Sequence, residues 1–91
     1  MKHEYNNEEL EGLLHDCKRD QELFDLVVRL PRAKLEAEFK KHHERVNERE
    51  DQDAYICTIF EFQGERIRIS TDMYEGRVFL RFANPGERAT P

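Results

Sequence analysis

The chain lacks most of the residue patterns that catalytic and phosphate-binding sites require. Its four glycines are isolated from one another, so none forms the glycine-rich loop that binds phosphate groups. Its single serine, Ser70, lacks the flanking glycines of a serine nucleophile on a strand-to-helix turn. Acidic residues are numerous, but nothing marks two of them as a general acid and base. We therefore expect a protein that is not an enzyme.

Cysteines and long apolar runs are also scarce. Cys17 and Cys57 lie in apolar segments, where a free cysteine behaves as a small buried hydrophobe, and two cysteines do not indicate a disulfide framework. No apolar stretch approaches the length of a signal-peptide core or a membrane span. We expect a cytoplasmic protein with reduced thiols and no membrane partner.

The histidines do not have the spacing of a metal site. His42 and His43 are adjacent, and adjacent residues of a helix point about 100° apart. Glu38 and His42 do have the four-residue spacing of ligands on one helix, but no second ligand pair accompanies them. We expect surface positions or positions in a helix seam for these histidines, with no metal and no cofactor.

Charge is abundant and unevenly distributed along the chain, whose formal net charge is -5. Residues 1–53 contain ten Lys and Arg against fifteen Asp and Glu, whereas residues 54–91 contain five of each class. An acidic balance disfavours nonspecific nucleic-acid binding, which needs a net positive footprint. A local group of arginines can still bind an anion.

The length of 91 residues predicts one domain with a thin core, spanning residues 1–91. Residues 7–50 are predicted to be helical, because their apolar residues recur at helical spacing. Asp20 is a candidate helix cap, and Pro31 ends one helix or begins the next. Whether the segment before Pro31 is one helix or two is left open. The apolar residues fall into three groups: Leu10, Leu13, Leu14 and Cys17; Leu23, Phe24, Val27, Val28 and Leu30; Leu35, Phe39, His42 and Val46.

Residues 54–83 are predicted to form a three-stranded antiparallel meander. Gln63 and Gly64 form a two-residue turn, which places Glu61 opposite Arg66 and keeps apolar residues on one side of the sheet. The second turn is expected within residues 72–76, and residues 84–91 are expected to be a mobile tail. The fold class is therefore α+β, with two or three N-terminal helices packed on one face of a C-terminal three-stranded antiparallel meander.

Alternation along these strands predicts one apolar side and one side that carries arginine and aromatic residues. The apolar side must face the helices. On the other side, Arg81 lies opposite either Arg66 or Arg68, and directly opposed like charges destabilise a sheet. Glu61 can offset part of this repulsion, and the remainder needs another source: an acidic helix of the same chain, the carboxylates of a partner, or phosphate groups.

The arginine and aromatic side is the candidate partner-binding surface, because an apolar centre with an arginine rim is typical of protein interfaces. The alternative is that the arginine stems only cover apolar surface while their charged ends reach water. The first and third strands are sheet edges without Pro or Lys, which invites pairing with another chain unless a helix covers them. The candidate residues are Tyr55, Ile59, Arg66, Arg68, Arg77, Phe79 and Arg81.

These features favour a small non-enzymatic protein-binding module, such as a regulator, inhibitor or adaptor, that binds a protein partner or pairs with itself as a homodimer. The alternative is single-stranded nucleic-acid binding, with Tyr55 and Phe79 stacking on bases and the arginines contacting phosphates. A further alternative is that the acidic helices mimic nucleic acid. Their interspersed basic residues weaken it, because mimicry requires an unbroken anionic stripe.

Overall fold

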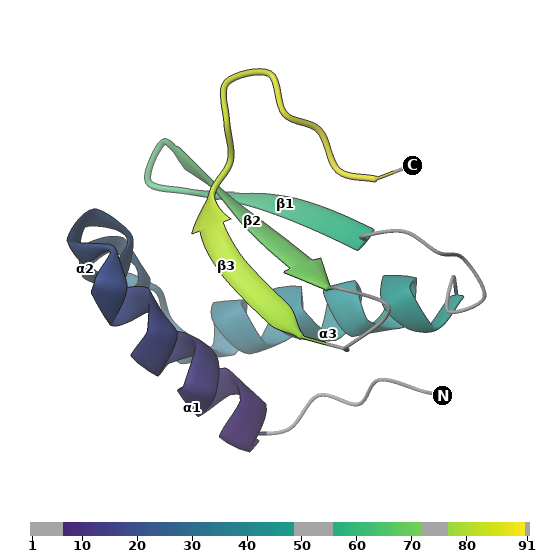
Figure 1. The fold of residues 1–91 in the computed structure, drawn as a ribbon, viewed down its shortest axis with the longest axis horizontal. Coiled ribbons are helices and arrows are strands. Elements are labelled where there is room, and N and C mark those ends of the chain that lie inside the picture. The colour runs from purple at the N-terminus through teal and green to yellow at the C-terminus, as the bar shows by residue number, and fades with distance from the viewer. Residues whose placement is uncertain (1–6, 49–55, 72–76, 91) are drawn as a thin grey trace.

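The helices precede a three-stranded antiparallel sheet, and together they form an α+β fold (Figure 1). The computed structural model describes residues 7–48, 56–71 and 77–90. The predicted fold class is confirmed. Tyr55 and the predicted turn within residues 72–76 lie outside the described residues. The elements are α1 (Asn7–Asp16), the short 3-10 helix η1 (Cys17–Arg19), α2 (Gln21–Arg29), α3 (Arg32–Glu48), β1 (Ile56–Phe62), β2 (Glu65–Thr71) and β3 (Val78–Phe82).

Two separate helices precede Pro31, which answers the question that the sequence left open. Asp20 leaves the helical conformation, with φ -111° and ψ 101°, and its side chain accepts a hydrogen bond of 3.2 Å from the Leu23 amide. This is the predicted cap, and it begins α2. The Pro31 carbonyl in turn accepts a hydrogen bond of 3.1 Å from the Leu35 amide, so the proline begins α3.

The sheet has the strand order β1-β2-β3. Gln63 and Gly64 both have positive φ, 51° and 80°, which suits the tight hairpin turn between β1 and β2. This turn produces the predicted pairing of Glu61 with Arg66. In the second hairpin Arg68 lies opposite Arg81, so the structure selects one of the two registers that the sequence left open.

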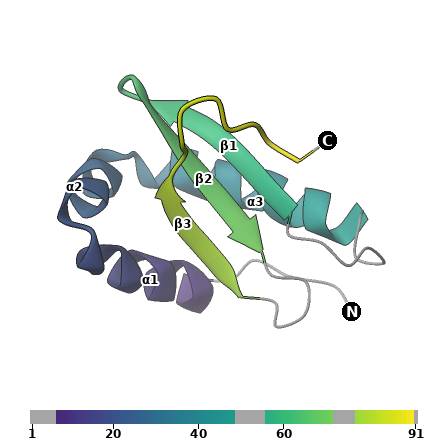
Figure 2. The ribbon, with the colours of Figure 1, turned by 45° about the horizontal axis from the view of Figure 1, so that its top comes forward.

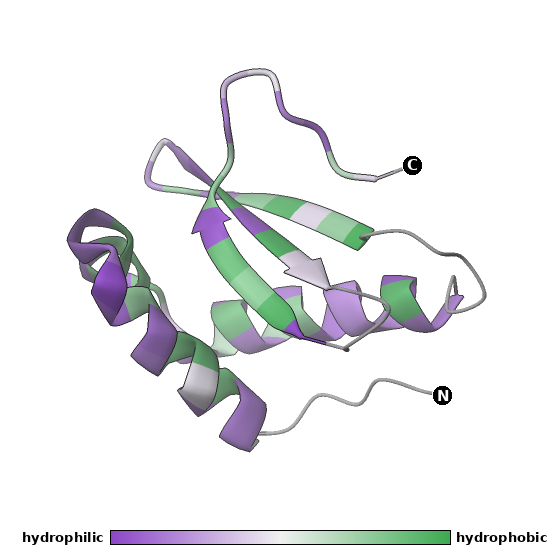
Figure 3. Cartoon of the chain, viewed as in Figure 1, coloured by the Kyte–Doolittle hydropathy of each residue, from purple (hydrophilic) through white to green (hydrophobic). Residues whose placement is uncertain are grey.

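The helices cover one face of the sheet, which we call the inner face. Helix α3 packs under β1 and β2, and α1 packs against β3 (Figures 1 and 2). Apolar residues predominate along the strands, and the helices carry both apolar and polar residues (Figure 3). The apolar residues with little or no exposure between the two layers include Leu10, Leu13, Leu23, Leu26, Val27, Leu35, Phe39, Phe60, Ile67 and Ile69.

One polar group lies within this layer. His42 is fully buried, and its ring nitrogens lie 2.7 Å from Thr58 Oγ1 and 2.6 Å from Thr71 Oγ1. It therefore ties α3 to β1 and β2 through hydrogen bonds, as buried polar groups require. His43 is also buried, and its Nε2 lies 3.0 Å from Glu9 Oε1 of α1. Both histidines belong to the interior of the fold, His42 in the predicted helix seam.

The described helices share one further property. None of them is both long and apolar enough to cross a membrane.

Candidate functional site

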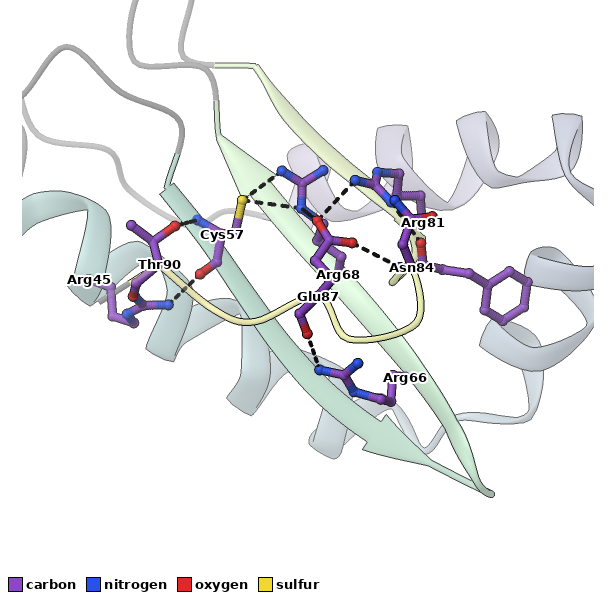
Figure 4. Close-up of polar contacts among 9 residues, drawn as sticks. Arg45, Cys57, Arg66, Arg68, Arg81, Asn84, Glu87 and Thr90 are labelled. Atoms are coloured by element: carbon purple, nitrogen blue, oxygen red, sulfur yellow. Dashed lines mark hydrogen bonds and ion pairs between the residues drawn. The ribbon is translucent and has the colours of Figure 1, made fainter.

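The outer face of the sheet, turned away from the helices, carries most of the residues that the sequence singled out. Arg66, Arg68 and Arg81 come together there on β2 and β3 (Figure 4). Phe79 lies on the same face of β3, and Arg77 directly precedes that strand. Ile59 is on β1, opposite Arg68. Nothing is described for Tyr55, so its predicted role stays a prediction.

A carboxylate of the same chain offsets the repulsion between the opposed arginines. Glu87 Oε2 lies 3.0 Å from Arg68 Nε and 3.1 Å from Arg81 Nη2. Arg66 adds a hydrogen bond from Nη2 to the Glu87 carbonyl oxygen (Figure 4). The sequence suggested an acidic helix, a partner or phosphate as the source of negative charge. None of these three is needed beside Arg68 and Arg81. Glu87 was not predicted as part of this site, because residues 84–91 were expected to be a mobile tail.

A turn after β3 brings Glu87 back over the sheet. The Asn84 carbonyl accepts a hydrogen bond of 3.0 Å from the Glu87 amide, and Gly86 between them has φ 80°. Proline at the second position and glycine at the third are typical of a type II turn, so Asn84-Pro85-Gly86-Glu87 was the available signal. The chain then crosses β2 and reaches β1 (Figures 1 and 4). The predicted mobility of residues 84–91 stays a prediction, but residues up to Thr90 contact the sheet.

The ionisation of Glu87 reflects these contacts. The Asn84 amide donates a 2.9 Å hydrogen bond to Glu87 Oε1, and Arg68 and Arg81 lie beside the same carboxylate. The amide hydrogen bond, followed by the two positive charges, lowers the pKa of Glu87 below its ordinary value of 4.5. Glu87 is therefore a carboxylate at neutral pH.

The end of the tail bonds to the outer edge of β1. Cys57 and Thr90 exchange two hydrogen bonds, from the Cys57 amide to Thr90 Oγ1 at 2.8 Å and from the Thr90 amide to the Cys57 carbonyl at 3.0 Å. Arg45 of α3 donates to the same carbonyl at 2.6 Å and also to the Thr90 carbonyl. Together, Thr90 and Arg45 satisfy the backbone groups of Cys57 that would otherwise be open to another strand.

Cys57 also contributes its side chain to the arginine cluster. Arg68 donates to Cys57 Sγ from Nη2 at 2.7 Å and from Nε at 3.1 Å. Cys57 is buried, and the tail lies over it at Thr90. The thiol therefore acts as an acceptor that helps to orient Arg68 toward Glu87.

The outer edge of β3 is different, because no described segment pairs with it. The Ala83 amide donates to the Arg66 carbonyl at 3.0 Å, so the odd-numbered residues of this stretch turn their backbone groups toward β2. By the same alternation, Val78, Leu80 and Phe82 turn their N–H and C=O groups away from the sheet. The Phe82 carbonyl accepts a 2.9 Å hydrogen bond from Arg81 Nη1, whereas no described segment pairs with Val78 and Leu80, whose outward groups are a template for an added strand.

A groove of about 390 Å³ runs beside this open edge, between β3 and the segment from α1 to α2. Its apolar lining includes Leu13, Cys17 and Leu23 from the helices, and its charged lining includes Asp16, Arg19, Asp20, Arg77 and Arg81. Burial, followed by the nearby Asp16 and Asp20, raises the pKa of the Cys17 thiol to about 11. This cysteine is therefore a neutral apolar part of the groove floor at physiological pH.

Phe79 stands at the rim of this groove and is 37% exposed. The Arg77 guanidinium carbon lies 4.9 Å from the centre of the Phe79 ring, within the range of a cation–π interaction. Val28, on α2, is the other large apolar residue that is clearly exposed among the described residues. Among the described residues, Phe79 is therefore the large aromatic side chain that is clearly exposed on the outer face.

The described residues contain no group of three or more His, Cys, Asp and Glu side chains that is arranged to hold a metal ion. The expectation that the protein needs no metal or cofactor stays a prediction.

Comparison with known proteins identifies no relative. No protein-family model matches the chain, and neither a curated protein nor a solved structure matches it. Any proposal about function must therefore come from the surfaces described above.

Proposed function

We propose that the protein is a small non-enzymatic protein-binding module, a regulator, inhibitor or adaptor, and that it binds along the open edge of β3. The observation that carries this proposal is the contrast between the two edges of the sheet. At the β1 edge the Cys57 backbone is bonded to Thr90 and Arg45. At the β3 edge no described segment takes up the groups of Val78 and Leu80. Adding a strand to an open edge is a common mode of peptide and protein recognition.

The surroundings of this edge also suit a protein partner. The groove beside β3 combines an apolar floor, to which Leu13 and Leu23 contribute, with a charged rim. Phe79 and Arg81 adjoin it, and aromatic residues and arginine are enriched in the centres of protein interfaces. Backbone hydrogen bonds along β3 would supply affinity, and the groove would select the side chains of the partner.

The tail covers part of the surface that the sequence suggested for partner binding. Glu87 engages Arg66 and Arg68 from above, and residues Arg88 and Ala89 line a hollow with Ile59 over β1. The parts of the candidate surface that remain beside the groove are Arg77, Phe79 and Arg81. We therefore assign partner binding to the β3 side of the outer face.

The two other functions considered from the sequence have less support. In single-stranded nucleic-acid binding, phosphates would have to displace Glu87 from Arg68 and Arg81. In nucleic-acid mimicry, the acidic residues of α3 would have to form an unbroken stripe, yet Glu36 and Glu38 pair with basic neighbours on the same helix. A cytoplasmic location fits both cysteines, which are buried and free.

The test is a double substitution at the rim of the groove, Phe79→Asp with Arg81→Glu. We expect it to abolish complex formation, as measured by affinity capture from native lysate and by sedimentation of the purified protein. Val28→Asp is the matched control, because Val28 is 58% exposed on α2 and does not line the groove beside β3. Circular dichroism must show that both variants fold. Unchanged complexes in the double variant would refute the proposal, and capture that nuclease abolishes would favour nucleic acid.

A further inference from the structure

We infer that the partner at this edge is a second copy of the chain, whose β3 pairs antiparallel with the first β3 about a twofold axis at Leu80. This inference rests on the proposed protein-binding function and identifies its partner. The product would be a continuous six-stranded sheet in the order β1-β2-β3-β3-β2-β1.

The hydrogen-bonding pattern of β3 fits this axis. Val78, Leu80 and Phe82 turn their backbone groups outward, and a twofold axis at Leu80 sets each of them opposite another outward residue. Leu80 faces Leu80 of the second copy, and Val78 faces Phe82 of the second copy. The two Leu80 residues then exchange N–H and C=O groups directly, as hydrogen-bonded pairs of an antiparallel ladder do. The Phe82 carbonyl accepts a 2.9 Å hydrogen bond from Arg81 Nη1, so Val78 of the second copy would share this acceptor with Arg81 or displace it.

Charge selects this register from its neighbours. An axis at Phe79 would set Arg77 opposite Arg81 of the second copy, and an axis at Arg81 would set the two Arg81 residues opposite each other. Both arrangements confront like charges, which destabilises a sheet. With the axis at Leu80, Arg81 lies opposite Phe79 of the second copy instead. No two arginines of β3 are then directly opposed across the twofold axis.

The contact between Arg81 and Phe79 is favourable in its own right. The two would form a non-hydrogen-bonded pair, in which the Cα atoms approach to about 4.5 Å and the side chains are close. A guanidinium over an aromatic ring is attracted to it. Arg81 is already held in the outer face by its 3.1 Å contact with Glu87, so the tail restricts this side chain before a partner arrives.

The inner side of the edge gains apolar cover from the same pairing. Val78, Leu80 and Phe82 are only partly buried against the core. Each would receive an apolar residue of the second copy beside it: Phe82, Leu80 and Val78, respectively. The valine, leucine and phenylalanine of the second copy would then cover the half-buried apolar edge formed by the same three residue types of the first.

The groove beside this edge carries side chains of both charges. In the antiparallel pairing, Arg77 of the second copy lies beyond Phe82 of the first. Both views place this end of β3 toward the corner between α1 and α2 (Figures 1 and 2). Asp16 and Asp20 come from that corner, but Arg19, Arg77 and Arg81 line the same groove, so its charge is mixed and the choice of partner does not rest on it.

The tail explains why such pairing would stop at two copies. The Cys57 backbone at the outer edge of β1 is bonded to Thr90 in each copy, and Arg45 contributes a further bond. Pairing through β3 alone is isologous and closed, whereas pairing through both edges would build a fibre. Because the tail occupies the β1 edge at Cys57, pairing through β3 favours a closed dimer.

The first part of the test measures association by sedimentation across a wide concentration range. We expect a wild-type dimer whose dissociation constant rises about tenfold or more in Leu80→Pro, because proline removes the outward N–H and two hydrogen bonds per dimer. Proline is tolerated at an edge where the N–H points away from the sheet. Val78→Pro tests the same edge if Leu80→Pro does not fold. Ile59→Pro, at the equivalent outward position of β1, is the matched control and should leave the dimer intact.

The second part tests the register by oxidative cross-linking. Phe79→Cys and Arg81→Cys proteins are mixed, and the axis at Leu80 predicts a disulfide between the two variants rather than within either one. Preferential linkage of two Phe79→Cys chains, or of two Arg81→Cys chains, would overturn the register. Cys17 and Cys57 are buried, so the folded protein should contribute little background.

The remaining outcomes separate this inference from the proposed function. A wild-type chain that stays monomeric at high concentration would overturn the second copy as partner. A dimer that persists in the β3 variants but dissociates in Ile59→Pro would overturn the choice of edge. If the chain is monomeric but a captured protein is lost in Leu80→Pro, protein binding at β3 stands and only its partner is different. If nothing binds in either assay, the proposed function fails as well.

Discussion

The two faces of the sheet are covered by different parts of the chain and by different chemistry. Helices cover the inner face with apolar side chains such as Phe39 and Leu35, which are almost without exposure. The tail covers part of the outer face with polar contacts, among them those of Glu87 and Thr90 (Figure 4). The first cover excludes water from the core, whereas the second leaves Phe79 exposed, and no described segment pairs with the outer edge of β3.

The two covers should therefore have different effects: the inner one mainly stabilises the fold, and the outer one mainly shapes the surface. Burial of apolar area contributes in proportion to that area and drives folding. A hydrogen bond at the surface mostly replaces one to water, so its net contribution is small. The inner cover should therefore dominate stability, and the outer cover should mainly decide which edges are open. Four predictions test this comparison, in order of decreasing effect on the free energy of unfolding.

The largest effect is expected for Phe39→Ala. Phe39 has no exposed surface, and truncation of a buried phenylalanine costs about 3–5 kcal/mol of unfolding free energy. Phe79→Ala is the matched control on the outer face and should cost much less, since Phe79 is 37% exposed. Urea denaturation measures both. Similar losses for the two variants would contradict the separation of the two covers.

The second prediction concerns His42, the polar group within the inner cover. His42→Leu leaves the buried Thr71 hydroxyl without the partner it has at 2.6 Å, at a cost of about 1–3 kcal/mol. Thr58 keeps its 2.9 Å hydrogen bond from Arg45, so Thr71 is the main loss. Adding Thr71→Val should recover part of the stability, because an apolar group of the same shape needs no partner. A double variant no more stable than His42→Leu alone would refute this explanation.

The third prediction concerns the attachment of the tail to β1. Thr90→Val removes the hydroxyl that accepts the Cys57 amide at 2.8 Å, and we expect a loss of about 0.5–1.5 kcal/mol. Thr90→Ser retains a hydroxyl and should lose less. Hydrogen exchange at the Cys57 amide should accelerate in the Val variant. If exchange there does not change, the tail does not protect the edge of β1.

The smallest effect on stability is expected from the titration of Glu87. Because its pKa is lowered in the folded protein, the stabilisation is present above its ordinary value of 4.5 and is lost as the pH falls through the lowered pKa. Glu87→Gln should remove this contribution, so the difference between wild type and variant should shrink below pH 4.5. Denaturation from neutral pH to strong acid measures it. A difference that does not depend on pH would contradict the role of the carboxylate.

The helical caps, the first hairpin and the apolar face could all be predicted from local patterns. Asp20 and Pro31 act through their own backbone geometry, and Gln63-Gly64 determines its turn and the pairing of Glu61 with Arg66. The register of the second hairpin could not be predicted in the same way. Its turn has no such short signal, and both candidate registers kept the apolar residues on one face.

The position of Glu87 could not be predicted from the sequence either. A turn at Asn84-Pro85-Gly86 indicates that the chain reverses, but not where the next residues come to lie. Their place depends on Arg66, Arg68 and Arg81, which become neighbours only when β2 and β3 pair. For the same reason the sequence correctly required a negative charge near opposed arginines but did not identify its source.

The sequence by itself determined the α+β class, the order of helices and strands, and which side of the sheet is apolar, because these follow from short-range periodicity and backbone preference. Only the tertiary structure decided that His42 joins α3 to two strands, that Glu87 lies between Arg68 and Arg81, and that Thr90 bonds to the β1 edge while no described segment pairs with the β3 edge. These contacts join residues far apart in the chain, and their geometry exists only once the core has brought the elements together.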